Sequence, residues 1–372
     1  GNIDKGIRAQ QEVAREVIDK MLTDLMDQLI IVIPDKTKTL EQYISEGYTY
    51  FKSKGGTLIR VTEGEGGNLA FEGGWQMEKN HKKLSSIEMF NKTNGRSYLL
   101  DSQMPLGATK SLYMTLREHN GQDGKDDKYA GFLNLLENDY CGEKLLSQRL
   151  SKKYTPANSR GGNKNFSLFD NYNYTVFVPS TEAITKLQND GILPTDSELE
   201  IDYVNKTGHA YESILDSICV AEKWYTTDAT RDDKEAIQEL AKECIANVVS
   251  DFVRYHIMDR SVAIGMAPET NADGNYESMK RNPETGRFFA LKVVYDQNSL
   301  TVTDIMGNSR QVNKTEGLYN NICREYWFEG SGNNSRLFMG SDAVVHLIDS
   351  PLYYDNLKPW RQVVAEYLKN NM

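Results

Sequence analysis

Residues 174–184 read YTVFVPSTEAI. The apolar run Val176 to Val178 predicts a buried strand, because β-branched and aromatic residues suit a pleated surface that is covered by other elements. Pro179 cannot continue the pairing, and Ser180 is a typical N-cap for a helix that starts at this point. The following apolar residues share one helical face, and they are Ala183, Ile184 and Leu187. This stretch therefore predicts a strand that leads directly into a helix.

The strongest helical periodicity lies further along the chain, between Lys234 and Ile257. Apolar residues recur there in alternating steps of three and one, which is the pattern of one broad apolar helix face. The same steps occur near the N-terminus, where the segment Val17 to Ile30 aligns with Cys244 to Ile257 without a gap. The sequence therefore indicates that one helix occurs twice.

The segments that follow the two helices are also similar in order. After the first helix come an apolar strand, a turn-rich interval and a terminal strand; after the second come two strands and a terminal strand. The expected strands are Thr57 to Val61 and Tyr98 to Asp101 in the first copy, and Arg287 to Tyr295, Leu300 to Asp304 and Val344 to Asp349 in the second. We interpret this as an internal repeat of a helix, a hairpin-rich sheet and a closing strand.

The two copies are unequal in their front halves. Residues 129–200 have no counterpart before the first helix, so the second copy is complete and the first begins in its middle. Between the copies, His119 to Asp127 (HNGQDGKDD) is polar and contains glycine, which predicts a linker. We expect the C-terminal part of a first domain in residues 1–120 and a complete second domain in residues 121–372.

Three motifs of the second copy resemble the signatures of fasciclin domains. Residues 174–184 are similar to the first signature, TVFAPTNEAF, and the helix end at Tyr255 and His256 is similar to the central tyrosine-histidine motif. Residues 343–352 (AVVHLIDSPL) resemble the last signature, GVVHVIDxVL. In the first copy Gln28 and Leu29 stand where Tyr255 and His256 stand, so the resemblance is partial there.

This resemblance implies an α+β fold, a wedge of two β-sheets flanked by helices. It also implies an adhesion-type surface protein of the bacterial kind, placed at the cell surface, anchored to the outer membrane or in the periplasm. Family members bind other proteins or glycans. A start at Gly1 without an initiator Met is expected for a piece of a longer precursor, whose lipid anchor, if it has one, would be its contact with the membrane.

The family motif nominates Tyr255 and His256 for partner binding. His256 continues the apolar stripe of its helix, so a buried and hydrogen-bonded histidine is expected there, as it is for His346 in the last strand. Tyr255 lies off the stripe, and we expect it to be exposed. Aromatic residues offer further contact candidates, either as stacking platforms or as core residues: Trp224, Tyr326, Trp327, and the group of Tyr353, Tyr354 and Trp360.

The sequence offers no constellation for catalysis. The five histidines form no close pair, no serine-nucleophile elbow is present, and the glycine clusters fail dinucleotide spacing. We therefore expect no catalytic, cofactor or metal site, although a carboxylate pair of a polysaccharide-acting enzyme remains open among the 53 acidic residues. A spacer without any ligand is the other alternative.

The composition is that of a globular protein with a net negative charge. Apolar residues make up 39% of the 372 residues, which is enough for packed cores, and the formal net charge of −10 disfavours nucleic acid as a partner. The oligomeric state is open. The four cysteines lack metal-site spacing, and we expect most to be buried thiols, with up to two disulfides compatible with their number: Cys141, Cys219, Cys244 and Cys323.

Overall fold

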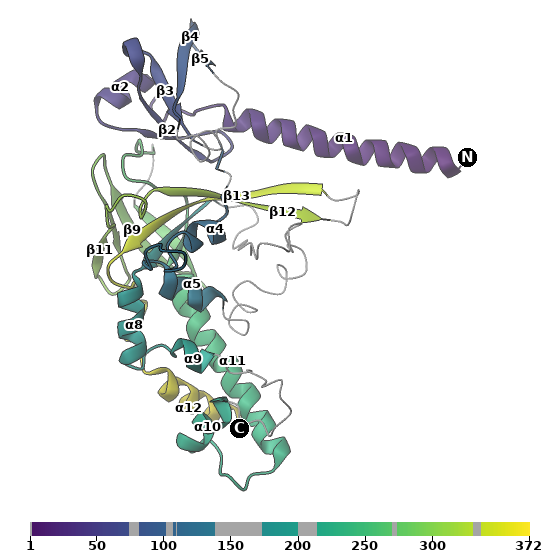
Figure 1. Cartoon of the computed structure of the whole chain (residues 1–372), viewed down its shortest axis with the longest axis vertical. Coiled ribbons are helices and arrows are strands. Elements are labelled where there is room, and N and C mark those ends of the chain that lie inside the picture. Colours follow the sequence, from purple (N-terminus) through teal and green to yellow (C-terminus); the bar gives the residue numbers. More distant parts are fainter. Residues whose placement is uncertain are drawn as a thin grey trace.

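The computed structural model describes residues 2–73, 82–101, 107–108, 110–137, 173–199, 214–269, 274–329 and 336–372. Two sheets and a set of helices make an α+β protein, which confirms the expected fold class. We call residues 2–101 the first unit and residues 110–372 the second unit. The first unit lies at one end of an elongated molecule, and the C-terminus lies near the other (Figure 1).

The first unit is one long helix followed by an antiparallel meander. Its strands pair in the order β1-β2-β3-β4-β5, each with the next along the chain. Helix α2 starts at a capping box, in which the Thr39 hydroxyl accepts a hydrogen bond from the backbone N–H of Gln42 and the Gln42 side chain accepts one from the backbone N–H of Thr39. The elements are α1 (Asn2–Gln28), α2 (Leu40–Ser45), β1 (Tyr50–Lys52), β2 (Leu58–Glu63), the 3-10 turn η1 (Glu65–Gly67), β3 (Leu69–Glu72), β4 (Leu84–Lys92) and β5 (Gly95–Leu100).

The second unit is built on an eight-stranded sheet with the order β11-β10-β9-β8-β7-β6-β13-β12. Its helices are α4 (Leu112–Arg117), α5 (Ala130–Glu137), α8 (Thr181–Asn189), α9 (Asp196–Leu199), α10 (Ile214–Ala221), α11 (Arg231–Tyr255) and α12 (Trp360–Asn371). Its strands are β6 (Tyr174–Pro179), β7 (Ile257–Asp259), β8 (Asn275–Arg281), β9 (Phe288–Tyr295), β10 (Leu300–Thr303), β11 (Ser309–Gln311), β12 (Asn321–Glu329) and β13 (Arg336–Ile348).

The strand that was expected from residues 174–184 lies in the middle of this sheet. β6 pairs in parallel with β13 on one side and antiparallel with β7 on the other. Ser180 caps α8 as expected, since its Oγ accepts a hydrogen bond of 3.3 Å from the backbone N–H of Ala183. The predicted strand-to-helix unit is confirmed.

Two hydrophobic cores cover the two faces of this sheet. Alternate residues of β6 point to opposite faces, so Val176 and Val178 enter one core while Phe177 enters the other. We call the first the helix-side core, because α4, α5, α8, α10, α11 and α12 contribute to it, and the second the strand-side core. β13 divides its residues in the same way, with Val345 and Leu347 on the helix side and Ile348 on the strand side.

The segment expected to be a linker is a turn between two helices of one core. The His119 Nδ1 and the Asp126 carboxylate are joined by a hydrogen bond of 2.7 Å across the turn, and the backbone N–H of Tyr129 donates to the carbonyl of His119. The apolar residues of α4 and α5 on either side belong to the same helix-side core. The linker prediction for residues 119–127 is therefore wrong, and the change from one core to the other lies before Leu112.

The closing strands of the two units occupy different places in their sheets. β13 lies inside its sheet between β6 and β12, whereas β5 pairs only with β4. The physical reason is that the described part of the first unit contains no strand of the β6 kind, so a closing strand has no parallel neighbour there. The repeat therefore holds for the order of helix and meander, and not for the closing strand.

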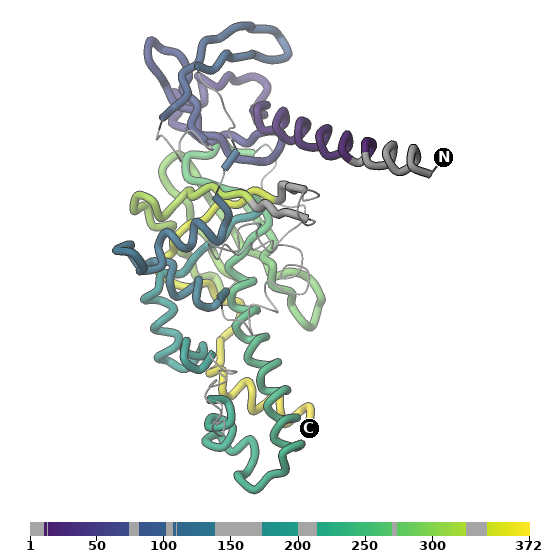
Figure 2. Tube along the Cα trace, turned by 45° about the vertical axis from the view of Figure 1, so that its right-hand side comes forward, coloured from purple at the N-terminus to yellow at the C-terminus, as the bar shows by residue number. Residues whose placement is uncertain are grey.

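The two units are joined by backbone pairing. The N–H groups of Thr49 and Tyr50 donate to the carbonyl of Gly265, and the N–H of Ala267 donates to the carbonyl of Tyr50. Leu58 of the first unit packs there with Ala263, Met266 and Val344 of the second. Both views of the chain show α1 projecting away from the rest of the molecule beside this junction (Figures 1 and 2).

Candidate binding site

Tyr255 is buried, although its position off the helical stripe predicts exposure. Its ring is fully enclosed in the strand-side core, edge to face with Phe289 and Tyr354. Its hydroxyl accepts a hydrogen bond of 2.8 Å from the backbone N–H of Ile305. The prediction failed because the end of α11 lies between the two cores, so both sides of the helix are covered there.

His256 is buried as expected, with both ring nitrogens bonded. Nε2 accepts a hydrogen bond of 2.9 Å from the backbone N–H of Leu352, so the ring proton is on Nδ1 and is donated to the carbonyl of Phe252 at 2.8 Å. Burial lowers the pKa of His256 to about 4, so the ring is neutral at pH 7. As folded, neither Tyr255 nor His256 is open to a partner.

His346, in the last strand, is also buried, but its two ring nitrogens have the opposite donor and acceptor roles to those of His256. Its Nδ1 accepts from the backbone N–H of Asn320 at 3.2 Å, and its Nε2–H donates to the carbonyl of Val262 at 2.9 Å. Burial lowers its pKa to about 4 as well. The expected buried histidine is confirmed, and its bonds join β13 to the loops that follow β7 and precede β12.

The other aromatic candidates fall in three different places. Trp224 is half-buried and packs edge to face on Trp360, which is itself buried in the helix-side core. Tyr326 and Trp327 lie on β12, opposite Met339 and Phe338 of β13, and their side chains are outside the described part of the structure. The structure therefore does not bring these candidates together into one site.

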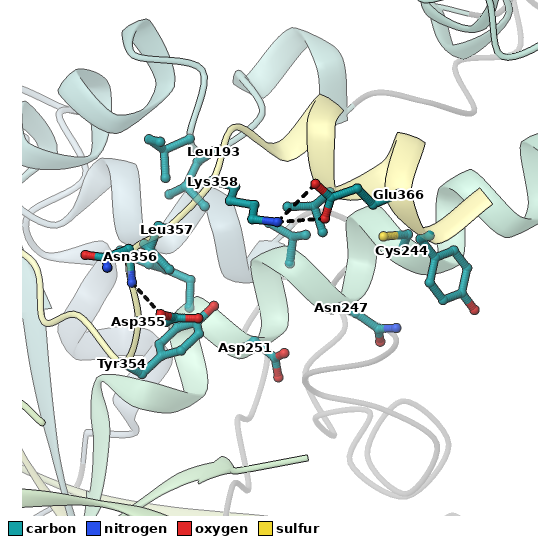
Figure 3. A pocket seen from close by; sticks show the side chains of 15 residues that line it. Leu193, Cys244, Asn247, Asp251, Tyr354, Asp355, Asn356, Leu357, Lys358 and Glu366 are labelled. Atoms are coloured by element: carbon teal, nitrogen blue, oxygen red, sulfur yellow. Dashed lines mark hydrogen bonds and ion pairs between the residues drawn. The ribbon is translucent and has the colours of Figure 1, made fainter. Parts of the chain in front are cut away.

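A cleft of about 390 Å³ lies beside the helix that carries Tyr255 and His256 (Figure 3). One wall is the C-terminal half of α11, the opposite wall is α12, and the segment between β13 and α12 closes one end. Its apolar floor includes Leu193, Val248 and Phe252. Its polar groups come from three separate segments of the chain: Asn247 and Asp251, then Tyr354, Asp355, Asn356 and Lys358, then Glu366 and Tyr367.

The charges around the cleft are largely paired. Lys358 holds Glu366 at 2.8 Å, and this hydrogen bond lowers the pKa of the Glu366 carboxyl. Asp251 pairs at 2.8 Å with Lys280, whose Nζ also lies 4.9 Å from the ring centroid of Tyr354. Burial raises the pKa of the Tyr354 hydroxyl, so it remains a neutral donor. The cleft therefore combines an apolar floor with amide, hydroxyl and carboxylate groups that can orient a polar ligand.

The described cysteines are buried, and the described residues form no metal-binding cluster. Cys219, Cys244 and Cys323 are buried and take part in no disulfide, as predicted, and Cys141 lies outside the described residues. Burial raises the pKa of Cys219 to about 11, so it is a thiol and a poor nucleophile at pH 7. Across the part of the chain that the structure describes, no three His, Cys, Asp or Glu side chains are arranged to hold a metal ion.

Of the residues that line this cleft, the sequence singled out only an aromatic residue at one side as a contact candidate. Tyr354 belongs to the aromatic group that was singled out, but Asn247 and Asp251 look like ordinary polar positions of an amphipathic helix. They become part of a site because α12 returns to pack along α11, more than a hundred residues later in the chain. A single sequence carries no signal for the packing of α12 against α11.

No helix within the described ranges has both the length and the apolar character that a bilayer crossing requires. No protein-family model matches the chain, and no curated protein matches it. Among solved structures it is similar to a FAS1 domain pair from the insect cell adhesion molecule fasciclin I, with 10% sequence identity and a TM-score of 0.29. That likeness covers 85% of this chain and 75% of the insect chain.

Proposed function

We propose that this chain is a non-enzymatic binding protein of the cell surface or periplasm, and that it recognises a glycan or a protein through the cleft between α11 and α12. The observation that carries the proposal is the chemistry of the cleft wall. Tyrosine hydroxyls, amides and carboxylates stand above an apolar floor, and most of the charges already have partners. Such a surface suits a neutral polar ligand, which gains hydrogen bonds without having to separate ion pairs.

The cleft walls are formed by elements of the core, which favours binding over a role as spacer. α11 and α12 pack on each other, and Val364 and Leu368 of α12 are buried in the helix-side core. A site held by packed helices keeps its polar groups in place before the ligand arrives, which lowers the entropic cost of binding.

A glycan array followed by calorimetry on the hits tests this proposal. Asn247 and Asn356 line the cleft and are exposed. Replacing both with Ala should therefore lower the affinity for a ligand of the cleft at least tenfold without changing the unfolding midpoint. Asn370→Ala, an equally exposed change on α12 away from the cleft lining, is the matched control and should leave affinity unchanged.

A parallel hydrolysis screen with the same glycans separates the alternatives. Turnover of any polysaccharide would replace the binding role with an enzymatic one. A chain that binds no glycan on the array and hydrolyses none would favour the spacer role, and the proposal of a glycan ligand would be lost.

A further inference from the structure

An apolar face of α1 lies open to solvent in the first unit. The residues Ile18, Met21, Leu22, Leu25 and Met26 are between 37% and 56% exposed, and they recur at helical spacing. We call these five residues the open face of α1. Exposed apolar groups gathered on one helix face, rather than scattered singly, mark a place where something binds.

The second unit shows what covers the same face of the equivalent helix. The segment Val17 to Ile30 aligns with Cys244 to Ile257, so Ile18 corresponds to Ile245 and Leu22 to Val249. Ile18 is 55% exposed whereas Ile245 is 1% exposed, and Leu22 is 54% exposed whereas Val249 is fully buried. The difference arises because α5, α10 and α12 pack against α11, and no described helix packs in this way on α1.

α1 and α11 also form a similar ion pair near their C-terminal ends. Asp24 and Asp251 occupy corresponding positions, and each forms an ion pair with a basic residue on a strand, Arg324 in one case and Lys280 in the other. Shortly after α1, Ile31 forms an isolated bridge with Ser53, and directly after α11, β7 pairs with β8. The sequence alignment of α1 with α11 is therefore matched in the structure by an ion pair at the corresponding aspartate.

We propose that the open face of α1 is a docking surface for an amphipathic helix of a partner polypeptide, which packs on α1 as α12 packs on α11. In the second unit, Cys244, Val248 and Phe252 line the cleft opposite Val363 and Tyr367 of α12. The corresponding stripe on α1 is Val17, Met21 and Leu25. The surface is separate from the cleft and is independent of the function proposed for it.

Charge favours a basic helix as the occupant. From residue 11 to residue 28, α1 carries five acidic side chains (Glu12, Glu16, Asp19, Asp24 and Asp27) and two basic ones (Arg15 and Lys20). Asp24 and Asp27 are already paired with Arg324 and Lys54, so three acidic side chains stand against two basic ones on the rest of this stretch. A second copy of α1 would add no excess of basic groups to pair with Glu12, Glu16 and Asp19, whereas a basic helix would. Residues 358–372, which contain α12, carry three basic side chains and one acidic one, so this segment has the complementary balance.

One polar contact of α12 also has a counterpart. The Tyr367 hydroxyl donates to Glu243 of α11 at 3.4 Å, and the position of Glu243 corresponds to Glu16 of α1. A helix with the sequence of α12 would therefore find a similar apolar stripe and a similar acceptor on α1. This gives the experiment a defined probe, because the α12 site on α11 is already occupied by the chain's own α12.

The test is the binding of a fluorescein-labelled peptide of residues 358–372 to the full chain, followed by fluorescence anisotropy at low and moderate salt. We expect saturable binding that weakens as salt is added and weakens at least tenfold in the double variant Met21→Glu, Leu25→Glu. Leu99→Glu, which places the same charge at an exposed apolar position of β5, is the control and should bind as the wild type does. A peptide of the same composition in scrambled order should not bind.

Light scattering on the unlabelled chain tests whether a second copy of the chain, rather than a partner helix, occupies the open face of α1. The proposal is overturned if the peptide shows no saturable binding, or if the double variant binds it as well as the wild type. A dimer of the full chain that dissociates in the double variant would also overturn it, because the occupant would then be a second copy. Far-UV circular dichroism of the variants should match the wild type, since both positions are exposed in the free chain.

Discussion

The imidazole of His256 and the backbone N–H of Leu352 are joined by a hydrogen bond of 2.9 Å inside the protein. The bond connects the last turn of α11 to the segment that leaves β13, two places nearly a hundred residues apart. Because the other ring nitrogen donates to the carbonyl of Phe252, the histidine has no bonding capacity left for a partner. The part of the sequence that most resembles a contact motif is therefore structural in this chain.

His256→Ala should destabilise the second unit by at least about 2 kcal/mol, because it leaves a buried N–H and a buried carbonyl without partners and opens a cavity. Urea unfolding monitored by tryptophan fluorescence measures this change. Asn370→Ala, on the exposed side of α12, should cost almost nothing. A His256→Ala protein of wild-type stability that has lost ligand binding would mean that the side chain is a contact after all.

Stability should fall as the pH is lowered from 7 to 5. The pKa values of His256 and His346 are about 4 in the folded protein, well below the ordinary 6.5, so the unfolded chain takes up protons in this range while the folded chain does not. Stability contributed by a lowered histidine pKa is complete above 6.5 and is lost as the pH falls toward 4. By the conversion of about 1.4 kcal/mol per pKa unit, each histidine accounts for roughly 2 kcal/mol between pH 7 and 5.

Replacing both histidines should flatten that pH dependence, whatever it does to stability at pH 7. The measurement is the free energy of unfolding at both pH values in the double variant His256→Gln, His346→Gln. A pH dependence that persists in full in this variant would place its origin in other groups.

Asp342 should act in the opposite direction. Burial raises its pKa to about 6, with Arg324 on the neighbouring strand partly offsetting the effect, so the folded protein takes up a proton there before the unfolded chain does. Its contribution is present at low pH and is lost as the pH rises through 6. Asp342→Asn removes this opposing contribution, so the loss of stability between pH 7 and 5 should become larger by about 1 kcal/mol. An unchanged pH dependence would contradict the assignment.

The sequence predicted the parts of the fold that are decided locally. The β6–α8 turn follows from Pro179 and the Ser180 cap, and α11 follows from its apolar stripe, because propensity, capping and burial all act within a few residues. The burial of Tyr255 could not be predicted in the same way. It depends on Phe289 and Tyr354, which reach it from other segments, and the sequence pattern reports only one face of a helix.

The cleft and the junction between the units escaped prediction for the same reason. The cleft needs α12 against α11, and the junction needs the Gly265 carbonyl beside Thr49 and Tyr50. Neither of these two contacts produces a periodic pattern in the sequence of the segments that form it. Of the cleft residues, the sequence singled out the aromatic residue Tyr354. It did not predict the polar groups that line the cleft with it.

Gly56→Ala should loosen the junction between the two units. Gly56 has a φ of +93°, and an added Cβ would lie 1.9 Å from the side-chain nitrogen of Asn173 in the second unit. Asn173 cannot simply move away, since its Oδ1 accepts a hydrogen bond from the backbone N–H of Asp342 and its carbonyl accepts one from Arg260. The variant should therefore lose about 1 kcal/mol for the displaced hydrogen bond in addition to the backbone strain of about 1–2 kcal/mol.

Gly67→Ala separates the two contributions to that loss. Gly67 has a φ of +80°, and a Cβ added there would meet no atom of another segment within 4 Å, so this change carries the backbone strain without the collision. Urea unfolding should show a larger loss for Gly56→Ala, and hydrogen exchange of the Asp342 amide should accelerate in that variant alone. Equal losses, with no change in exchange at Asp342, would mean that Asn173 yields freely and that the junction depends instead on the pairing of Thr49 and Tyr50 with Gly265.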